Sequence, residues 1–289
     1  MKIGNPGSLN YHLPILAYHK VDLKKELGIT SISPKKFERQ INFLKQNGYI
    51  SISPQSLLNQ INPLLSPKGI FNMPLQKGEE KYVLITFDDG YEGIYEYAYP
   101  ILKRYGFTAT IFLTTGYIGS YNKWDASPGP RFKHLNWQQI KAMSDNGICF
   151  GSHGINHLFM TKHSDETIRY ELETSKEIIE DKLSKPVLFF SYPYGDHNKR
   201  LIELVSETGY KLAFSLKPEI LSADYLVCPY ELPRFAIYCI DGMKAFKAKI
   251  GESNGSLIYI QRLKNQLINR CSYAGVIFER GSKILRLED

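Results

Sequence analysis

Cysteine is scarce in this sequence, and its spacing argues against a cysteine-based metal site. The four cysteines are Cys149, Cys228, Cys239 and Cys271, and they show no close spacing of the metal-binding type. Three of them lie in apolar or strand-like segments. We therefore expect free, buried thiols.

Long apolar runs are also missing. Residues 1–11 contain Gly, Pro, Ser and Asn but no apolar core of about 7 to 15 residues, so no secretory signal is predicted. No stretch approaches the roughly 18 apolar residues of a membrane span. As written, the sequence predicts a cytoplasmic location, and an extracytoplasmic one if a leader has been removed.

The positive charge is not gathered into a tail. The formal charge is +7 and the pI is about 9.0, but Lys and Arg are scattered, without a run of about five or six. An acidic partner, such as a phosphorylated glycan, an anionic membrane surface or nucleic acid, is one interpretation of this charge. A solvated surface is the favoured one, and nucleic acid is not expected as a partner.

The composition that remains is that of a folded α/β protein. The chain has 289 residues, of which 43% are hydrophobic and 22% charged, and this is ordinary for one large globular domain. Short β-branched or apolar runs alternate with amphipathic segments, as in βα units. Strands are expected at 15–18, 82–86, 108–114, 148–151, 187–190, 211–215 and 234–238, and helices at 34–48, 94–105, 137–146, 165–183 and 198–208.

The number of βα units favours a barrel. Six to eight such units exceed one nucleotide-binding half, and no βα turn carries a GxGxxG or GxxxxGK[ST] loop. We predict an α/β fold: a single-domain, distorted (β/α) barrel of about seven strands. The expected layout is an N-terminal extension (1–13), the barrel (14–250) with a loop insertion near 53–80, and a C-terminal extension (251–289) that packs on the barrel.

The C-terminal extension contains an apolar stripe at helical spacing, formed by Leu257, Ile260, Leu263 and Leu267. Packing of this stripe against the barrel is the favoured interpretation. Contact with a membrane surface is the alternative, so peripheral membrane contact is left open, as is the oligomeric state.

Two adjacent acids follow the strand YVLIT. Asp88 and Asp89 stand before Gly90, and adjacent carboxylates repel each other unless a cation or a proton is present. A turn is an equally good explanation, because Asp-Gly favours one. In a barrel, however, catalytic groups come from the carboxyl ends of strands, and this pair occupies such a position.

Two histidines follow the strand at 148–151. His153 and His157 are four residues apart and could meet one metal ion if the turn between them is helical, and neutral imidazoles with a carboxylate suit a divalent transition ion. Two unrelated loop histidines are the alternative. With Asp89, the pair would form a three-ligand face that leaves positions for water and substrate.

Two further strand ends carry polar or turn residues. The segment FFSYPYGDHN runs into a loop whose tip holds Pro193, Tyr194 and Gly195, where a backbone N–H could face a developing oxyanion. His19 directly follows the first strand and could supply a proton from the other side of the site. A simple turn and a surface histidine are the respective alternatives.

Together these segments closely resemble the polysaccharide deacetylase family, also called carbohydrate esterase family 4. TFDDG (86–90) matches its first motif, SHGINH (152–157) an altered form of its second, and SYPYG (191–195) its third, and the resemblance spans about residues 14–250. LPILAYHKV and YPYG look more like the branch of exported poly-N-acetylglucosamine deacetylases than the chitin or peptidoglycan branch. In that branch a histidine near the N-terminus replaces the late one, and His19 is the matching position.

The resemblance implies a role for each residue. Asp88 would be the general base, Asp89, His153 and His157 would hold the metal, and His19 would be the general acid. The backbone N–H of Tyr194 would stabilise the oxyanion. Zinc is the favoured metal, while cobalt, nickel, iron or manganese would suit the same ligands.

The sequence departs from the family at two points. The Arg that usually opens the third motif is absent, and Arg234 is the candidate to orient Asp88 in its place, although a lone Arg is more often part of a surface ion pair. The second motif lacks the hydroxyl that normally follows the first histidine. Tyr192, Pro193 and Trp137 are candidates for substrate binding, with core packing an equal alternative for Trp137.

The function expected from this resemblance is metal-dependent removal of N-acetyl groups from an amino-sugar polysaccharide or glycolipid. A deformylase or amidase that acts on a lipid- or nucleotide-linked sugar is the first alternative. A catalytically silent glycan-binding module is the second, and the intact Asp88, Asp89, His153 and His157 argue against it.

Overall fold

The computed structural model describes residues 12–24, 26, 28–61, 80–122, 130–222 and 228–284, and side chains are described for all of these except 60, 61 and 271–284. The strands are β1 Ile15–Tyr18, β2 Lys20–Val21, β3 Ser31–Ile32, β4 Tyr49–Ser51, β5 Lys81–Phe87, β6 Thr110–Leu113, β7 Cys149–Ser152, β8 Phe189–Ser191, β9 Leu212–Phe214 and β10 Phe235–Ala236. The α-helices are α1 Pro34–Gln46, α2 Pro54–Ile61, α3 Tyr99–Tyr105, α4 Trp137–Asp145, α5 Asp165–Leu183, α6 Lys199–Glu207, α7 Met243–Lys249 and α8 Gly255–Ile284. Four short helical segments join them: η3 Ile94–Ala98, η4 Thr115–Tyr117, η5 Met160–Lys162 and η6 Pro193–Gly195.

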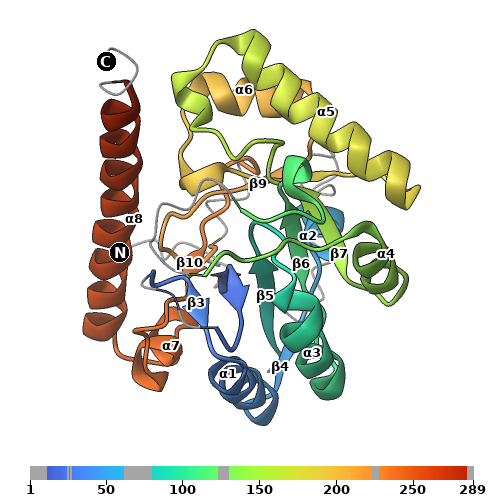
Figure 1. Ribbon diagram of the computed structural model, residues 1–289. Coiled ribbons are helices and arrows are strands. Elements are labelled where there is room, and N and C mark those ends of the chain that lie inside the picture. Colours follow the sequence, from blue (N-terminus) through green and yellow to red (C-terminus); the bar gives the residue numbers. More distant parts are fainter. Residues whose placement is uncertain are drawn as a thin grey trace, which may run out of the picture.

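The main sheet is parallel and curled. Seven strands follow the order β10-β1-β5-β6-β7-β8-β9, and β4 pairs with the first half of β5. Helices α1, α3, α4, α5 and α6 lie around the outside of the sheet (Figure 1). This is a distorted (β/α) barrel, and it confirms the predicted fold class.

Capping residues explain where the outer helices begin. The side chains of Ser33, Asn136, Ser164 and Asn198 each accept a hydrogen bond from a backbone N–H in the first turn of α1, α4, α5 and α6. Such caps satisfy donors that have no partner within the helix. The starts of these helices are therefore encoded locally.

The helix predicted at 94–105 has two parts. Residues 94–98 form the π-helical η3, in which the N–H of Tyr99 donates to the carbonyl of Ile94, and α3 follows. Pro100 has no N–H, so an unbroken α-helical ladder through this position is impossible. Gly106 ends α3 in the left-handed conformation, with φ 72°.

The alternation of side chains along β5 fills two separate clusters. Val83, Ile85 and Phe87 pack beneath the outer helices, whereas Leu84 joins a second cluster on the opposite face of the sheet. Two leucines of α2, Leu57 and Leu58, belong to this second cluster. The predicted loop at 53–80 therefore begins with a helix that contributes to the core, and residues 62–79 lie outside the described residues.

Helix α8 attaches to the barrel through its polar side. Asn265 is fully buried and donates to the carbonyl of Ala236, at 2.9 Å, whereas Ile260, Leu263 and Leu267 are exposed. The expectation that the apolar stripe faces the barrel is wrong for these three residues. The reason is that the inner side of α8 supplies donors to barrel carbonyls, such as that of Ala236, which accepts from both Asn265 and, on α7, Lys249.

Two smaller expectations can be compared with the structure. Cys149, Cys228 and Cys239 are free, as expected, but the first two are only half-buried and Cys239 is exposed, so burial was wrongly predicted; the side chain of Cys271 lies outside the described residues. Among the helices described, none has both the length and the apolar character that crossing a bilayer requires.

Candidate active site

Strand register places His19 and Asp88 side by side. Tyr18 of β1 is the partner of Phe87 of β5, and the N–H of Asp88 donates to the carbonyl of Tyr18, at 2.9 Å. Both strands end at this point, so the residues that follow them lie together at the carboxyl edge of the sheet. His19 is half-buried and close enough to interact electrostatically with both Asp88 and Asp89.

Asp88 is held by a fully buried arginine. Arg234 Nη1 donates to Asp88 Oδ1 at 2.8 Å and Nη2 donates to Oδ2 at 2.9 Å, which is a bidentate pair. The guanidinium also donates to the hydroxyls of Thr86 and Ser191 and to the carbonyl of Ser215. The contact predicted between Arg234 and Asp88 is therefore present, and it spans 146 residues of sequence.

The environment of Asp88 favours its charged form. Burial alone would raise its pKa, but the charge of Arg234, followed by His153, outweighs burial and holds the pKa below its usual range. Asp88 is consequently an ionised carboxylate at neutral pH, with a fixed orientation.

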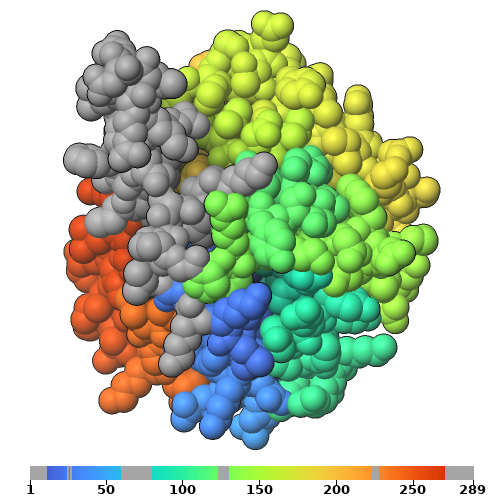
Figure 2. Space-filling view, viewed as in Figure 1, coloured from blue at the N-terminus to red at the C-terminus, as the bar shows by residue number. Residues whose placement is uncertain are grey.

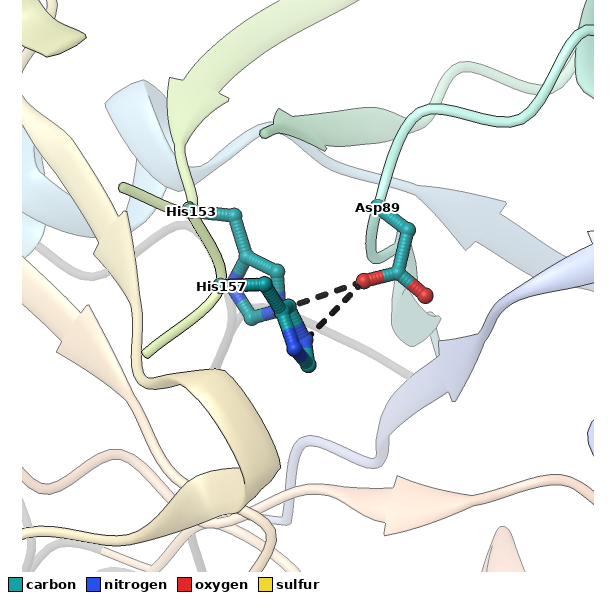
Figure 3. Close-up of side chains that lie close together, drawn as sticks. All are labelled: Asp89, His153 and His157. Carbon is teal, nitrogen blue, oxygen red and sulfur yellow. Dashed lines mark ion pairs between the residues drawn. The ribbon is translucent and has the colours of Figure 1, made fainter. Parts of the chain in front are cut away.

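Asp89, His153 and His157 converge on one point (Figure 3). Oδ1 of Asp89 lies 3.5 Å from Nε2 of His153 and 3.2 Å from Nε2 of His157. All three residues are buried, and one ligand atom from each lies within 4.8 Å of the others. This is the only such group of three or more potential ligands within the described parts of the chain.

The environment of His153 makes its Nε2 a suitable ligand atom. Its Nδ1 lies 2.7 Å from the carbonyl of Ser191, which only accepts, so Nδ1 carries the proton and Nε2 presents a lone pair. Burial lowers the pKa of His153 to about 4. The ring is therefore neutral at physiological pH, as metal ligation requires.

His157 is positioned by a loop and not by the helical turn that the spacing suggested. Residues 153–157 are non-helical, with Gly154 at φ 78° and His157 at φ 54°. The buried carboxylate of Glu171 on α5 accepts from the N–H groups of Ile155 and Asn156, at 2.7 and 3.0 Å. Glu171 thus shapes the loop that brings His157 back beside His153.

Asp89 also has an uncommon backbone, with φ 69°, which an L-residue adopts at some energetic cost. Its carbonyl lies 2.9 Å from Nδ1 of His134, a fully buried ring that packs against Tyr91. With this backbone, the carboxylate of Asp89 points to the two histidines. Two adjacent acids are in this way directed to different partners.

The three converging side chains fit a divalent transition metal. Among the described residues, the buried Oδ1 of Asp89 accepts no hydrogen bond. Burial alone would raise the pKa of Asp89, but the neighbouring imidazoles lower it well below its usual range. One carboxylate and two imidazoles with converging donor atoms match the ligands of catalytic zinc sites.

Tyr194 lies at the edge of this cluster. It has φ 60° inside η6, its ring stacks on Phe159 with 3.8 Å between centroids, and the edge contact to the His157 ring is 4.4 Å. Tyr194, backed by Phe159, therefore covers one side of the His157 ring. The structure thus brings Tyr194 to the site from a third strand end.

The predicted substrate-binding residues are placed less favourably. Tyr192 is fully buried, and its hydroxyl donates to the carbonyl of Tyr230 at 2.9 Å, so its ring offers no face to a sugar. Pro193 is also buried. Trp137 is half-buried at the start of α4 and packs against the core, which agrees with the core alternative. The strand end turns the side chains of Tyr192 and Pro193 inward, and substrate contact at these two positions stays a prediction.

Several residues around the site were not found from the sequence. Glu171 falls on the buried stripe of α5 with Ile168, Leu172 and Ser175, and an acid on such a stripe is the signal that could have revealed it. Ser191 and His134 left no comparable signal. Their roles depend on contacts between distant segments.

The fold and the site define the class of protein, which is a distorted (β/α) barrel with a cluster of buried polar side chains at the carboxyl ends of its strands. Residues 76–213 match the family model of the polysaccharide deacetylases. YxkH of Bacillus subtilis, a protein named as a polysaccharide deacetylase, is 32% identical over 214 residues, which cover 73% of this chain and 67% of the relative. The chain belongs to the polysaccharide deacetylase family.

Two further relatives extend this comparison. A poly-β-1,6-N-acetyl-D-glucosamine N-deacetylase of Staphylococcus aureus is 29% identical over 225 residues, covering 74% of this chain and 70% of that enzyme. The solved structure of Streptococcus pyogenes deacetylase PplD in complex with acetate has a TM-score of 0.66 and 25% identity, and the match covers 80% of this chain and 94% of that one. The relatedness therefore extends well beyond the segment that the family model matches.

Proposed function

We propose that this protein is a metal-dependent hydrolase that removes N-acetyl groups from an amino-sugar polysaccharide or glycolipid. The observation that carries the proposal is the pair of adjacent carboxylates with separate environments: Asp88 is fixed by Arg234, while Asp89 faces His153 and His157. The substrate named for the Staphylococcus aureus relative supports N-acetylglucosamine as the sugar.

The metal would be held by Asp89, His153 and His157, with zinc as the favoured ion. When bound, such an ion supplies Lewis-acid polarisation of the acetyl carbonyl and of the attacking water. The fit rests on the convergence of three buried donor atoms and on the neutral state of His153.

The residues of the chain would divide the proton transfers. Asp88, ionised and oriented by Arg234, accepts a proton from the attacking water as the water oxygen bonds to the acetyl carbon. The backbone N–H of Tyr194 stabilises the oxyanion that develops on the carbonyl. His19, in its protonated form, delivers a proton to the amine as the C–N bond breaks, and the products are acetate and a free amino sugar.

The decisive experiment measures acetate release from N-acetylglucosamine oligomers together with the metal content of the protein. Wild type is stripped with a chelator and reloaded separately with zinc, cobalt, nickel, iron or manganese, beside His153→Ala. We expect release by the reloaded wild type only. Metal-loaded protein that releases formate from N-formyl oligomers but no acetate would replace the proposal with the deformylase alternative, and failure to bind any metal would disprove the ligand set.

A further inference from the structure

In its described part, at the left edge of the molecule (Figure 2), helix α8 exposes an apolar stripe, whereas its two most buried side chains, Gln261 and Asn265, are polar. Tyr259, Ile260, Leu263 and Leu267 are 60%, 53%, 41% and 62% exposed. They recur at the spacing of one helix face, which we call the outer stripe of α8. Helices that cover a barrel normally show the opposite arrangement, so this stripe requires an explanation.

The attachment of α8 to the barrel is polar. Asn269 donates to the carbonyl of Leu216 at 2.9 Å and accepts from the hydroxyl of Tyr238 at 2.7 Å. Lys264 pairs with the buried Asp241. These contacts fix the rotation of the helix about its axis, so that the outer stripe faces away from the barrel.

Charge around the stripe indicates what covers it. Residues 243–270 contain six basic residues, Lys244, Lys247, Lys249, Arg262, Lys264 and Arg270, and a single acid, Glu252. Glu252 is paired with Lys81 at 2.6 Å, and Lys249 and Lys264 are paired with Asp241. The exposed Lys244 and Arg270 thus have a positive charge that no acid of this segment balances.

We propose that the outer stripe of α8 docks on the surface of an anionic lipid bilayer. An interfacial helix combines an apolar face with basic residues, and a tyrosine with an apolar body and a polar tip suits the headgroup region. Basic residues near an anionic bilayer add electrostatic attraction. A second copy of the chain fits less well, because a specific dimer buries about 800 Å² per partner over about 20–30 residues, and the described stripe has four large side chains.

Docking in this way has a geometric consequence for the site. Helix α8 contacts η6, the segment that carries Tyr194. A helix with its side chains is about 10–12 Å across. The bilayer would therefore lie about one helix diameter from η6, and the outer stripe would face the lipid without covering the catalytic residues.

The test uses the full chain and sedimentation with vesicles. We expect at least tenfold stronger partitioning into vesicles of equal parts phosphatidylglycerol and phosphatidylcholine than into pure phosphatidylcholine. Raising the salt to about 1 M should weaken it, because salt screens exposed charges. Leu263→Asp with Leu267→Asp should reduce binding to the anionic vesicles at least tenfold while the rate of acetate release from soluble oligomers stays unchanged.

A matched pair of tyrosines provides the control. Tyr259 on α8 and Tyr170 on α5 are both 60% exposed, so Asp at either position alters an equally exposed ring. Only Tyr259→Asp should weaken vesicle binding, and thermal unfolding should be the same for both variants. The proposal is overturned if wild type does not sediment with anionic vesicles, if the two tyrosine variants bind equally, or if sedimentation in solution shows a dimer that the leucine variants dissociate.

Discussion

Asp88 and Asp89 are adjacent in sequence and opposite in environment. Both oxygens of Asp88 accept hydrogen bonds from Arg234, and Ser191 donates to one of them at 3.2 Å. Asp89 instead lies beside the imidazoles of His153 and His157. One carboxylate is paired with a fixed internal cation, and the other converges with two imidazoles.

The comparison shows how two adjacent carboxylates at one strand end can acquire different chemical properties. A residue whose charge is compensated within the protein keeps its charge and orientation without help. A residue without such compensation is suited to an external cation. The backbone changes conformation at the same place, since φ is 69° at Asp89.

The substitution Asp88→Asn tests most directly whether Asp88 and Asp89 have separate roles. We expect kcat to fall by about 10² to 10⁴, the usual contribution of a positioned proton acceptor, while one metal ion per chain is retained. Acetate release and metal analysis of the same sample measure both. Loss of the metal together with activity would show that the two carboxylates share one role.

Removal of Arg234 should affect stability and pH dependence together. Arg234→Ala leaves Asp88 buried without a counterion, which we expect to lower the free energy of unfolding by about 3–5 kcal/mol. Because the guanidinium holds the pKa of Asp88 down, the acidic limb of the kcat/KM profile should move to higher pH. Arg234→Lys, which keeps the charge, should shift that limb less; an unchanged limb in both variants would mean that Arg234 is only structural.

The stability of the metal-free protein should depend on pH through His153. Burial lowers the pKa of His153 to about 4, whereas the unfolded chain takes up this proton near pH 6.5. Between these values the unfolded state binds more protons, so stability falls as the pH drops from about 6.5 towards 4, by about 3 kcal/mol in full. Urea unfolding of chelator-treated protein should show a steeper decline for wild type than for His153→Gln, and parallel declines would contradict the assignment.

Substitution of Glu171 tests whether the conformation of the loop before His157 affects metal affinity. Glu171→Ala removes the acceptor of two N–H groups in the loop before His157, and we expect metal affinity to fall about 10- to 100-fold. Glu177→Ala on the exposed side of the same helix is the matched control, with no change expected. Metal titration followed by calorimetry distinguishes them, and equal affinities would remove Glu171 from the site.

The sequence predicted the fold class and most elements because their signals are local. Strand runs such as 82–86, the caps of α1 and α5 and the glycine at the end of α3 depend on neighbours in sequence. The rotation of α8 could not be predicted in this way. Its apolar stripe shows that one face needs cover, but only the buried Asp241 and the barrel carbonyls determine which face turns inward.

In the candidate site, too, the features that depend on local sequence could be predicted, and those that depend on distant contacts could not. Asp89, His153 and His157 were brought together because each follows a parallel strand, and such strands end at one edge of the barrel. A helical turn was the condition set for the two histidines to meet, but a loop shaped by Glu171 from a distant helix brings them together instead. The burial of Tyr192, which follows β8 and packs beside Phe190, could not be predicted locally, because it depends on which face of the strand packs against the helices.

The residues of the site with positive φ have a consequence for any selection for thermostability. Four residues other than glycine have positive φ in the described chain, and three of them, Asp89, His157 and Tyr194, belong to the site. Each such conformation costs on the order of 1 kcal/mol, which glycine would avoid. A screen for heat tolerance alone would therefore accept glycine at these positions and discard the catalyst, so thermostability and turnover are opposing traits at this edge of the barrel.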